Sequence, residues 1–64
     1  MGEESVEAIL ELSREEAYAL AQLAKRTGFS DVRELAVDEG EAYAMIYALS
    51  KLRDALAASG VRVR

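Results

Sequence analysis

Apolar residues recur at helical spacing in three segments of the chain, and this pattern predicts three helices. We expect them over residues 13–27, 30–36 and 39–59. The longest has the clearest apolar stripe, which consists of Ala42, Met45, Ile46, Leu49, Leu52 and Leu56. The two shorter helices offer the stripes Ala17, Leu20, Ala21, Leu23, Ala24 and Val32, Leu35, Ala36. Packed together, the three stripes would form one small core.

Local signals mark where the first and third helices begin and where the first one ends. Ser13 and Glu16 have the spacing of a capping box, in which the cap hydroxyl accepts from an amide and the carboxylate reaches back. Asp38 and Glu41 repeat that spacing ahead of the longest helix. Gly28 is expected to end the first helix in the left-handed conformation.

Residues 6–12, VEAILEL, have an apolar residue at every second position from Val6 to Leu12, and this pattern favours a short strand. A helix capped by Ser5 is the alternative, but the fresh helix start at Ser13 argues that the preceding segment is not helical. The tail 61–64, VRVR, alternates apolar and polar positions and would be the partner strand. The expected fold class is therefore α+β and predominantly helical, with an all-α bundle as the alternative.

Length and composition predict a single small domain over residues 1–64 that needs help to be stable. A chain of 64 residues buries a smaller fraction of its surface than a large domain does. Small scaffolds usually add disulfides, a metal or a second chain. Since the chain has no Cys and no His, a homodimer is the expected means of stabilisation.

The charge balance argues against two classes of partner. With a net charge of −4, the chain has no general electrostatic attraction for nucleic acid or for an anionic membrane. The N-terminal MGEESVEA is acidic where a signal peptide would be basic, and no apolar run approaches the ~20 residues of a membrane span. A cytoplasmic location is the expectation.

Candidate chemistry for catalysis or metal binding is scarce. Without His or Cys, only carboxylates are available as acid–base groups, and a chain of this size seldom encloses a dry pocket for them. The acidic run Asp38, Glu39 and Glu41 does not follow a calcium-loop spacing, and helix capping accounts for it. We expect no enzyme, no metal site and no cofactor.

Tyr43 and Tyr47 lie four residues apart in the longest helix, outside its apolar stripe. Tyrosine combines a large apolar area with a polar tip and is enriched at interface hot spots. A contact face for a second copy or a foreign protein is therefore expected on that side of the helix. Its residues would be Tyr43, Tyr47, Ser50 and Asp54, with Phe29 and Asp31 as a second group beside the preceding turn.

The stretch LELSREEAYALAQLAKRTGFS resembles the strand and first helix of ribbon-helix-helix repressors, whose paired strands enter the DNA major groove. The outward strand positions here are Glu7, Ile9 and Glu11, where DNA recognition needs donors such as Arg or Asn. This DNA-binding repressor is kept only as an alternative.

Residues 8–60 as a whole resemble a small bacterial domain family of unknown function, found in proteobacterial genomes and mobile elements. The segments that carry the resemblance are ALAQLAKRTGFSDVR, the AVD turn and EAYAMI. The resemblance implies a stand-alone helical module without an assigned reaction, and it supplies no catalytic residues.

A mobile-element origin would favour one further class, the small acidic inhibitors of host defence complexes, of which anti-CRISPR proteins are examples. The N-terminal part has an acidic surface in which Glu7, Glu11 and Glu15 would stand in for DNA phosphates. The function expected first is a homodimeric, non-enzymatic module that regulates or inhibits a protein partner. The anti-CRISPR-like inhibitor is the second expectation.

Overall fold

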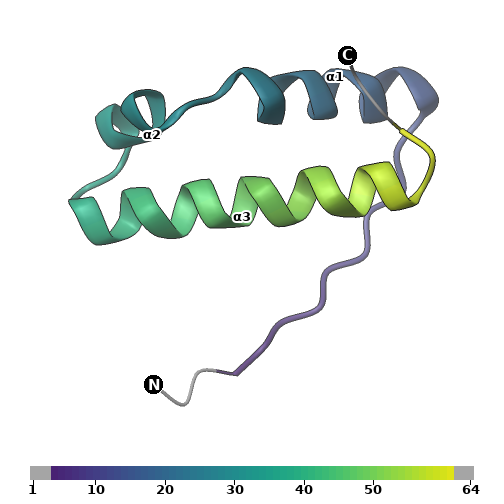
Figure 1. Ribbon diagram of the computed structural model, residues 1–64. Coiled ribbons are helices and arrows are strands. Elements are labelled where there is room, and N and C mark those ends of the chain that lie inside the picture. The colour runs from purple at the N-terminus through teal and green to yellow at the C-terminus, as the bar shows by residue number, and fades with distance from the viewer. Residues whose placement is uncertain (1–3, 62–64) are drawn as a thin grey trace.

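The structure, a computed structural model, describes residues 4–61, and three helices account for most of them. Helix α1 covers Arg14–Arg26, α2 covers Phe29–Leu35 and α3 covers Glu39–Ala58. Both α1 and α2 pack against α3, one after the other along its length (Figure 1). The described residues form no strand, so the all-α alternative is correct and the α+β prediction is wrong for the single chain.

Helices α1 and α3 each begin at a side-chain cap. The Ser13 hydroxyl accepts from the Glu16 amide at 3.1 Å, and the Ser13 amide donates to Glu16 Oε1 at 3.0 Å, so the predicted capping box is confirmed. Asp38 Oδ1 accepts from the Glu41 amide at 2.8 Å, as predicted for α3. The Glu41 carboxylate, however, reaches one residue further back and accepts from the Val37 amide.

The junction between α1 and α2 differs from the prediction at Gly28. Its φ is −104°, so it is not a left-handed helix end; Thr27 ends α1, and Gly28 is the N-terminal cap residue of α2. The Gly28 amide donates to Asp31 Oδ2 at 2.8 Å, which satisfies one of the exposed amides at this helix start. The chain therefore passes from one helix to the next with almost no loop.

Helix α3 ends in a Schellman motif, in which the residue after the cap is left-handed and two amides turn back to helix carbonyls. Gly60 has a φ of +94°, and its amide donates to the Ala57 carbonyl at 3.0 Å. The Val61 amide donates to the Leu56 carbonyl at 2.8 Å, and the Val61 side chain packs beside Leu56. Val61 thus belongs to the helix end and not to a strand; the rest of the predicted 61–64 strand lies outside the described residues.

The core is small because alanines supply most of it. The buried residues are Ala17, Ala21, Ala24, Val32, Ala42 and Leu56, and no large side chain is fully buried among the described residues. Alanine allows α1 to approach α3 closely, but it removes little apolar area from water. The α3 stripe is buried or half-buried as predicted, whereas Leu23 and Leu35, which were also expected in the core, are exposed.

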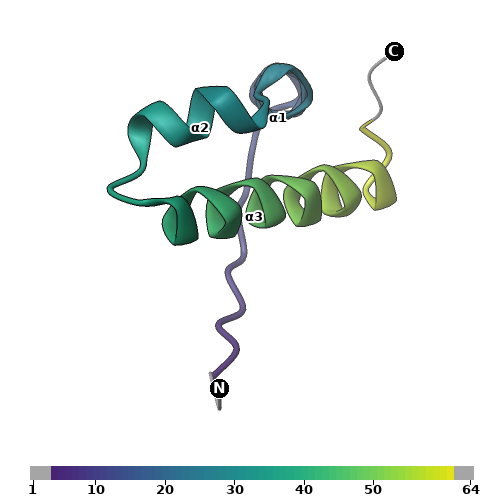
Figure 2. The same ribbon diagram turned by 60° about the vertical axis from the view of Figure 1, so that its left-hand side comes forward.

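Residues 4–12 form an extended segment, which we call the arm. The arm leaves the start of α1 and runs clear of the helices (Figures 1 and 2). Its last residue, Leu12, packs on the core cluster, while Val6, Ile9 and Leu10 are exposed. The prediction of a strand over 6–12 is wrong here because the described part of the chain offers the arm no strand to pair with.

Candidate functional site

Three aromatic rings gather where α2 meets the first half of α3. The Phe29 and Tyr43 ring centroids lie 4.9 Å apart with the ring planes at 41°, and Tyr43 and Tyr47 follow at 6.2 Å and 31°. These tilted arrangements lie in the range in which aromatic pairs attract. We call Phe29, Tyr43 and Tyr47 the aromatic cluster.

The aromatic cluster faces solvent, and its exposure grows along α3. The exposed fraction is 37% for Phe29, 46% for Tyr43 and 62% for Tyr47. Neither tyrosine hydroxyl makes a hydrogen bond within the described residues, so both remain available to a partner. Rings that already contact one another lose little conformational freedom when a partner covers them, which favours binding.

The structure brings one residue of the second predicted contact group, Phe29, against the first group, whereas the other, Asp31, caps the start of α2. Phe29 was placed in a second group, yet it stacks directly on Tyr43. Ser50 and Asp54 are exposed and continue the line of Tyr43 and Tyr47 at helical spacing along α3. The Asp31 carboxylate accepts a hydrogen bond from the Gly28 amide, and this capping bond accounts for an acidic residue at position 31 without any partner protein.

The sequence patterns alone did not predict that Phe29 contacts the tyrosines of α3. The missing information was the fold of the segment between α2 and α3, which turns α2 back onto α3 (Figure 1). The short connection between α2 and α3 could have predicted this contact, since two helices joined by a few residues usually pack side by side.

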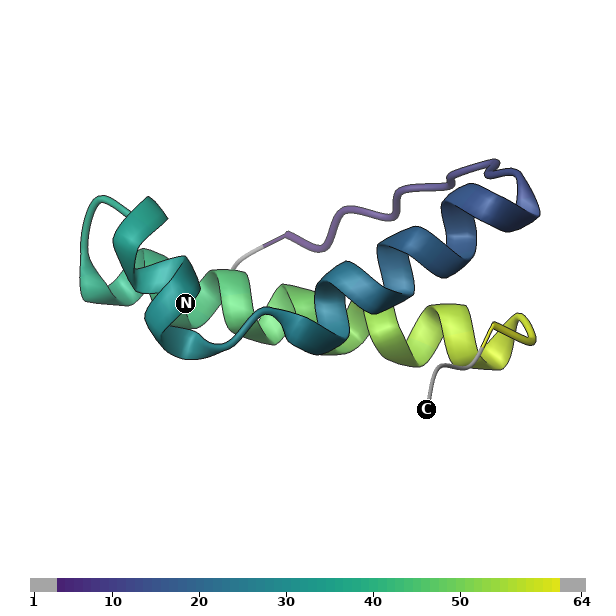
Figure 3. The ribbon, with the colours of Figure 1, turned by 90° about the horizontal axis from the view of Figure 1, so that it is seen from above.

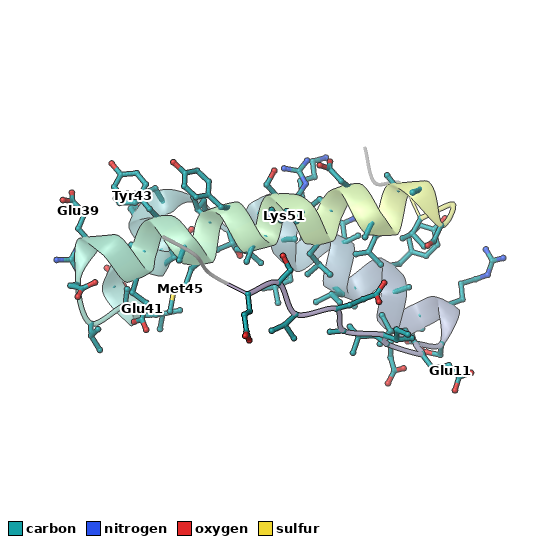
Figure 4. All side chains as sticks on the ribbon, turned by 90° about the horizontal axis from the view of Figure 1, so that it is seen from below. Glu11, Glu39, Glu41, Tyr43, Met45 and Lys51 are labelled. Carbon is teal, nitrogen blue, oxygen red and sulfur yellow. The ribbon has the colours of Figure 1, made fainter. Side chains whose placement is uncertain are left out.

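The predicted acidic surface lies elsewhere. Glu7 and Glu11 are exposed on the arm, and Glu15 is exposed in the first turn of α1. Glu11 and Tyr43 lie on opposite sides of the molecule when it is seen from below (Figure 4). The acidic surface and the aromatic cluster are therefore separate features, and one ligand of small size would not touch both.

A hollow of about 310 Å³ lies at the other end of the helices, where the arm joins α1. Its apolar lining comes from Leu10, Leu12, Ala17, Tyr18, Leu56 and Val61. Within residues 4–61, no three acidic side chains converge as a metal site would require. No helix in this part of the chain has the length and apolar character needed to cross a membrane.

Comparison with known proteins places the chain in a family. Residues 1–64 match DUF7706, a family of unknown function, and the chain belongs to it. The resemblance to an uncharacterised small domain family is thereby confirmed. No curated protein matches the chain significantly. No solved structure does so either.

Proposed function

We propose that the chain is a non-enzymatic interaction module, active as a homodimer in the cytoplasm, that regulates or inhibits a protein by binding it. The aromatic cluster is the proposed contact for that protein, with Ser50 and Asp54 at its edge. The observation that carries the proposal is the exposure of three adjoining rings on a chain whose own core holds no fully buried large side chain among residues 4–61.

A protein partner suits this surface better than a small molecule does. The cluster lies along the outside of α3 and not in an enclosed pocket, as its exposed rings indicate. Small-molecule sites are concave and cover most of their ligand, whereas protein interfaces are broad and centre on aromatic anchors. Burying two tyrosines that are already ordered would supply apolar area at a low cost in entropy.

The test compares three immobilised proteins in a capture experiment from bacterial lysate: the wild type, Tyr43→Ala/Tyr47→Ala and Tyr43→Phe/Tyr47→Phe. A captured protein is then purified and its affinity measured by calorimetry. We expect the alanine variant to lose at least ~2 kcal/mol, about thirtyfold in Kd, as hot-spot residues do. The phenylalanine variant keeps the rings and should retain most of the affinity. Equal affinity for wild type and alanine variant would overturn the proposal.

The exposed acidic surface supports a second candidate, an anti-CRISPR-like inhibitor that presents carboxylates where a basic protein expects phosphates. Glu7, Glu11 and Glu15 are all exposed and lie on neighbouring parts of the chain, the arm and the first turn of α1. Glu7→Gln/Glu11→Gln/Glu15→Gln should then weaken the capture of a basic partner and reduce its salt dependence. If the variant binds as the wild type does, this candidate fails and the first is unaffected.

A further inference from the structure

The arm exposes three large apolar side chains to solvent. Val6 and Ile9 are 88% and 89% exposed, and Leu10 is 64% exposed. Within the described residues, the backbone amides and carbonyls of residues 4–12 make no hydrogen bonds. An extended backbone with free donors and acceptors and an apolar face is a template for pairing with another strand.

The chain exposes more surface than a compact protein of its size does. Its solvent-accessible surface is 5453 Å², whereas a compact protein of 7.0 kDa exposes roughly 4,000 Å². Its radius of gyration is 12.8 Å, against roughly 11 Å for a compact domain of this length. The excess of roughly 1,400 Å² exceeds the ~800 Å² that each partner buries in a standard protein interface. The chain therefore has enough uncovered surface for an interface of standard size with a second copy of itself.

We propose that the arms of two copies pair as an antiparallel ribbon centred on Ala8, and that this pairing holds the homodimer together. The inference rests on the homodimeric part of the proposed function and names the segment responsible. The arm runs alongside the helical layer without lying against α3, so its edge is accessible to a second chain (Figure 3). Pairing about Ala8 uses the whole of residues 4–12, because Ala8 is the midpoint of that range.

Side-chain pairing favours this register over those centred on Ile9 and Leu10. About Ala8, Val6 of each copy lies opposite Leu10 of the other, and Glu7 lies opposite Ile9. Centring the ribbon on Ile9 would instead place Glu7 directly opposite Glu11 twice, and like charges at that position are destabilising. Centring it on Leu10 would shorten the pairing to residues 8–12. The next pair outward would need Ser13, whose amide is already engaged by Glu16.

The register also fills the hollow beside the arm. In an extended segment, alternate residues share a face, so Leu10, Ala8 and Val6 continue the side on which Leu12 packs on the core. Val6 of the second copy, opposite Leu10, would lie at the opening of the hollow that Leu10 and Leu12 line. Each copy thus completes an apolar site of the other, which a single chain leaves open.

This dimer leaves both aromatic clusters uncovered. Tyr43 lies on the side of α3 away from the arm (Figure 4). The dimer would therefore present two equivalent protein-binding faces, and a partner with two sites would gain affinity from both. Dimerisation and partner binding are consequently separable by mutation.

The first experiment compares Val6→Glu with Val37→Glu by sedimentation equilibrium. Both valines are almost equally exposed, at 88% and 83%, but Val37 lies between α2 and α3, away from the arm. We expect Val6→Glu to weaken the dimer at least tenfold and Val37→Glu to change it by less than twofold. Circular dichroism of both variants checks that the helices, which do not include residue 6, remain folded.

The second experiment uses the absence of native cysteine. Ala8→Cys places two thiols across the twofold axis of the ribbon, and oxidation with copper phenanthroline should convert most of the protein to a covalent dimer. Val37→Cys, treated at the same concentration, reports random collisions and should cross-link at least tenfold more slowly. Equal rates for the two variants would overturn the register.

The outcomes separate the inference from the function on which it rests. A dimer that withstands Val6→Glu, and in which Ala8→Cys does not cross-link, overturns the arm pairing and leaves the homodimer standing. A dimer that Tyr43→Ala/Tyr47→Ala dissociates assigns the interface to the aromatic cluster instead. A wild-type chain that stays at 7.0 kDa at every concentration overturns both the pairing and the homodimer.

Discussion

The Phe29 ring stacks on Tyr43, with the centroids 4.9 Å apart, and thereby ties the first residue of α2 to α3. Phe29 and Tyr43 are 37% and 46% exposed, so a large part of both residues remains turned to solvent. One pair of residues thus orders the α2–α3 junction and presents an apolar face. Substitutions here must be designed to separate a loss of stability from a loss of binding.

A double-mutant cycle on Phe29→Ala and Tyr43→Ala should measure the stabilising part of this contact. We expect a coupling free energy of ~0.5–1.5 kcal/mol, because tilted aromatic pairs at this separation attract beyond their burial. Urea unfolding followed by circular dichroism supplies the four free energies of unfolding. The cycle between Phe29 and Tyr47, which are not in ring contact in this structure, is the control and should give a coupling near zero.

Two glycines, Gly40 in the first turn of α3 and Gly60 just after its end, should respond to alanine in opposite directions. Gly60→Ala should destabilise the chain by roughly 1–2 kcal/mol, because a φ of +94° strains any residue with a Cβ. Gly40→Ala should stabilise it by up to ~1 kcal/mol, since alanine favours the helix and the new Cβ would meet only Asp38 Oδ1, at 3.5 Å.

Thermal unfolding of the two variants measures both effects. One kcal/mol corresponds to roughly 4–8 °C in Tm for a domain of this size. A destabilised Gly40→Ala would mean that the Asp38 cap is disturbed, and Asp38→Ala alone, expected to cost ~1 kcal/mol, would then give a similar loss.

What could be predicted from sequence here is what depends on neighbours within a few residues. The capping box of Ser13 and Glu16 formed because both partners lie in one helical turn. The stripe of α3 was predictable because a single 3.6-residue period decides which side chains share a face. The solvent-facing position of Tyr43 and Tyr47 follows from the same period.

The predictions that were wrong concern contacts between segments that are distant in the sequence. Leu23 and Leu35 were expected in the core, but each short helix has only α3 to pack against, and one neighbour covers a narrow stripe. The molecule is only 15 Å thick along its shortest axis, so no further layer reaches those leucines. The arm has the apolar residues of a strand face at every second position from Val6 to Leu12, yet this spacing specifies a face and supplies no pairing partner.

Stability should depend on protein concentration if the chain is a homodimer. Two folded chains associate and two unfolded chains do not, so a tenfold rise in concentration favours the folded dimer by about 1.4 kcal/mol. Tm measured by calorimetry over a hundredfold range of concentration should therefore rise for the wild type. The Val6→Glu variant, expected to be monomeric, should show a constant Tm. A wild-type Tm that does not move would contradict dimerisation in that range.

The arm ribbon should also tighten as salt is added. It would bring Glu7 and Glu11 of both copies onto one face, and each chain already has a net charge of −4, so repulsion opposes the association. Raising the ionic strength from about 0.03 to 0.3 M shortens the screening length to well below 10 Å and should lower the dimer Kd several-fold. An interface held by ion pairs would weaken instead.

Sedimentation equilibrium at several salt concentrations measures the slope of the dimer Kd against ionic strength. Glu7→Gln/Glu11→Gln should flatten it, whereas Glu34→Gln/Glu39→Gln, which removes the same charge from exposed positions outside the arm, should reduce it only slightly. Equal slopes for the two double variants would show that net charge, and not the ribbon face, controls the association.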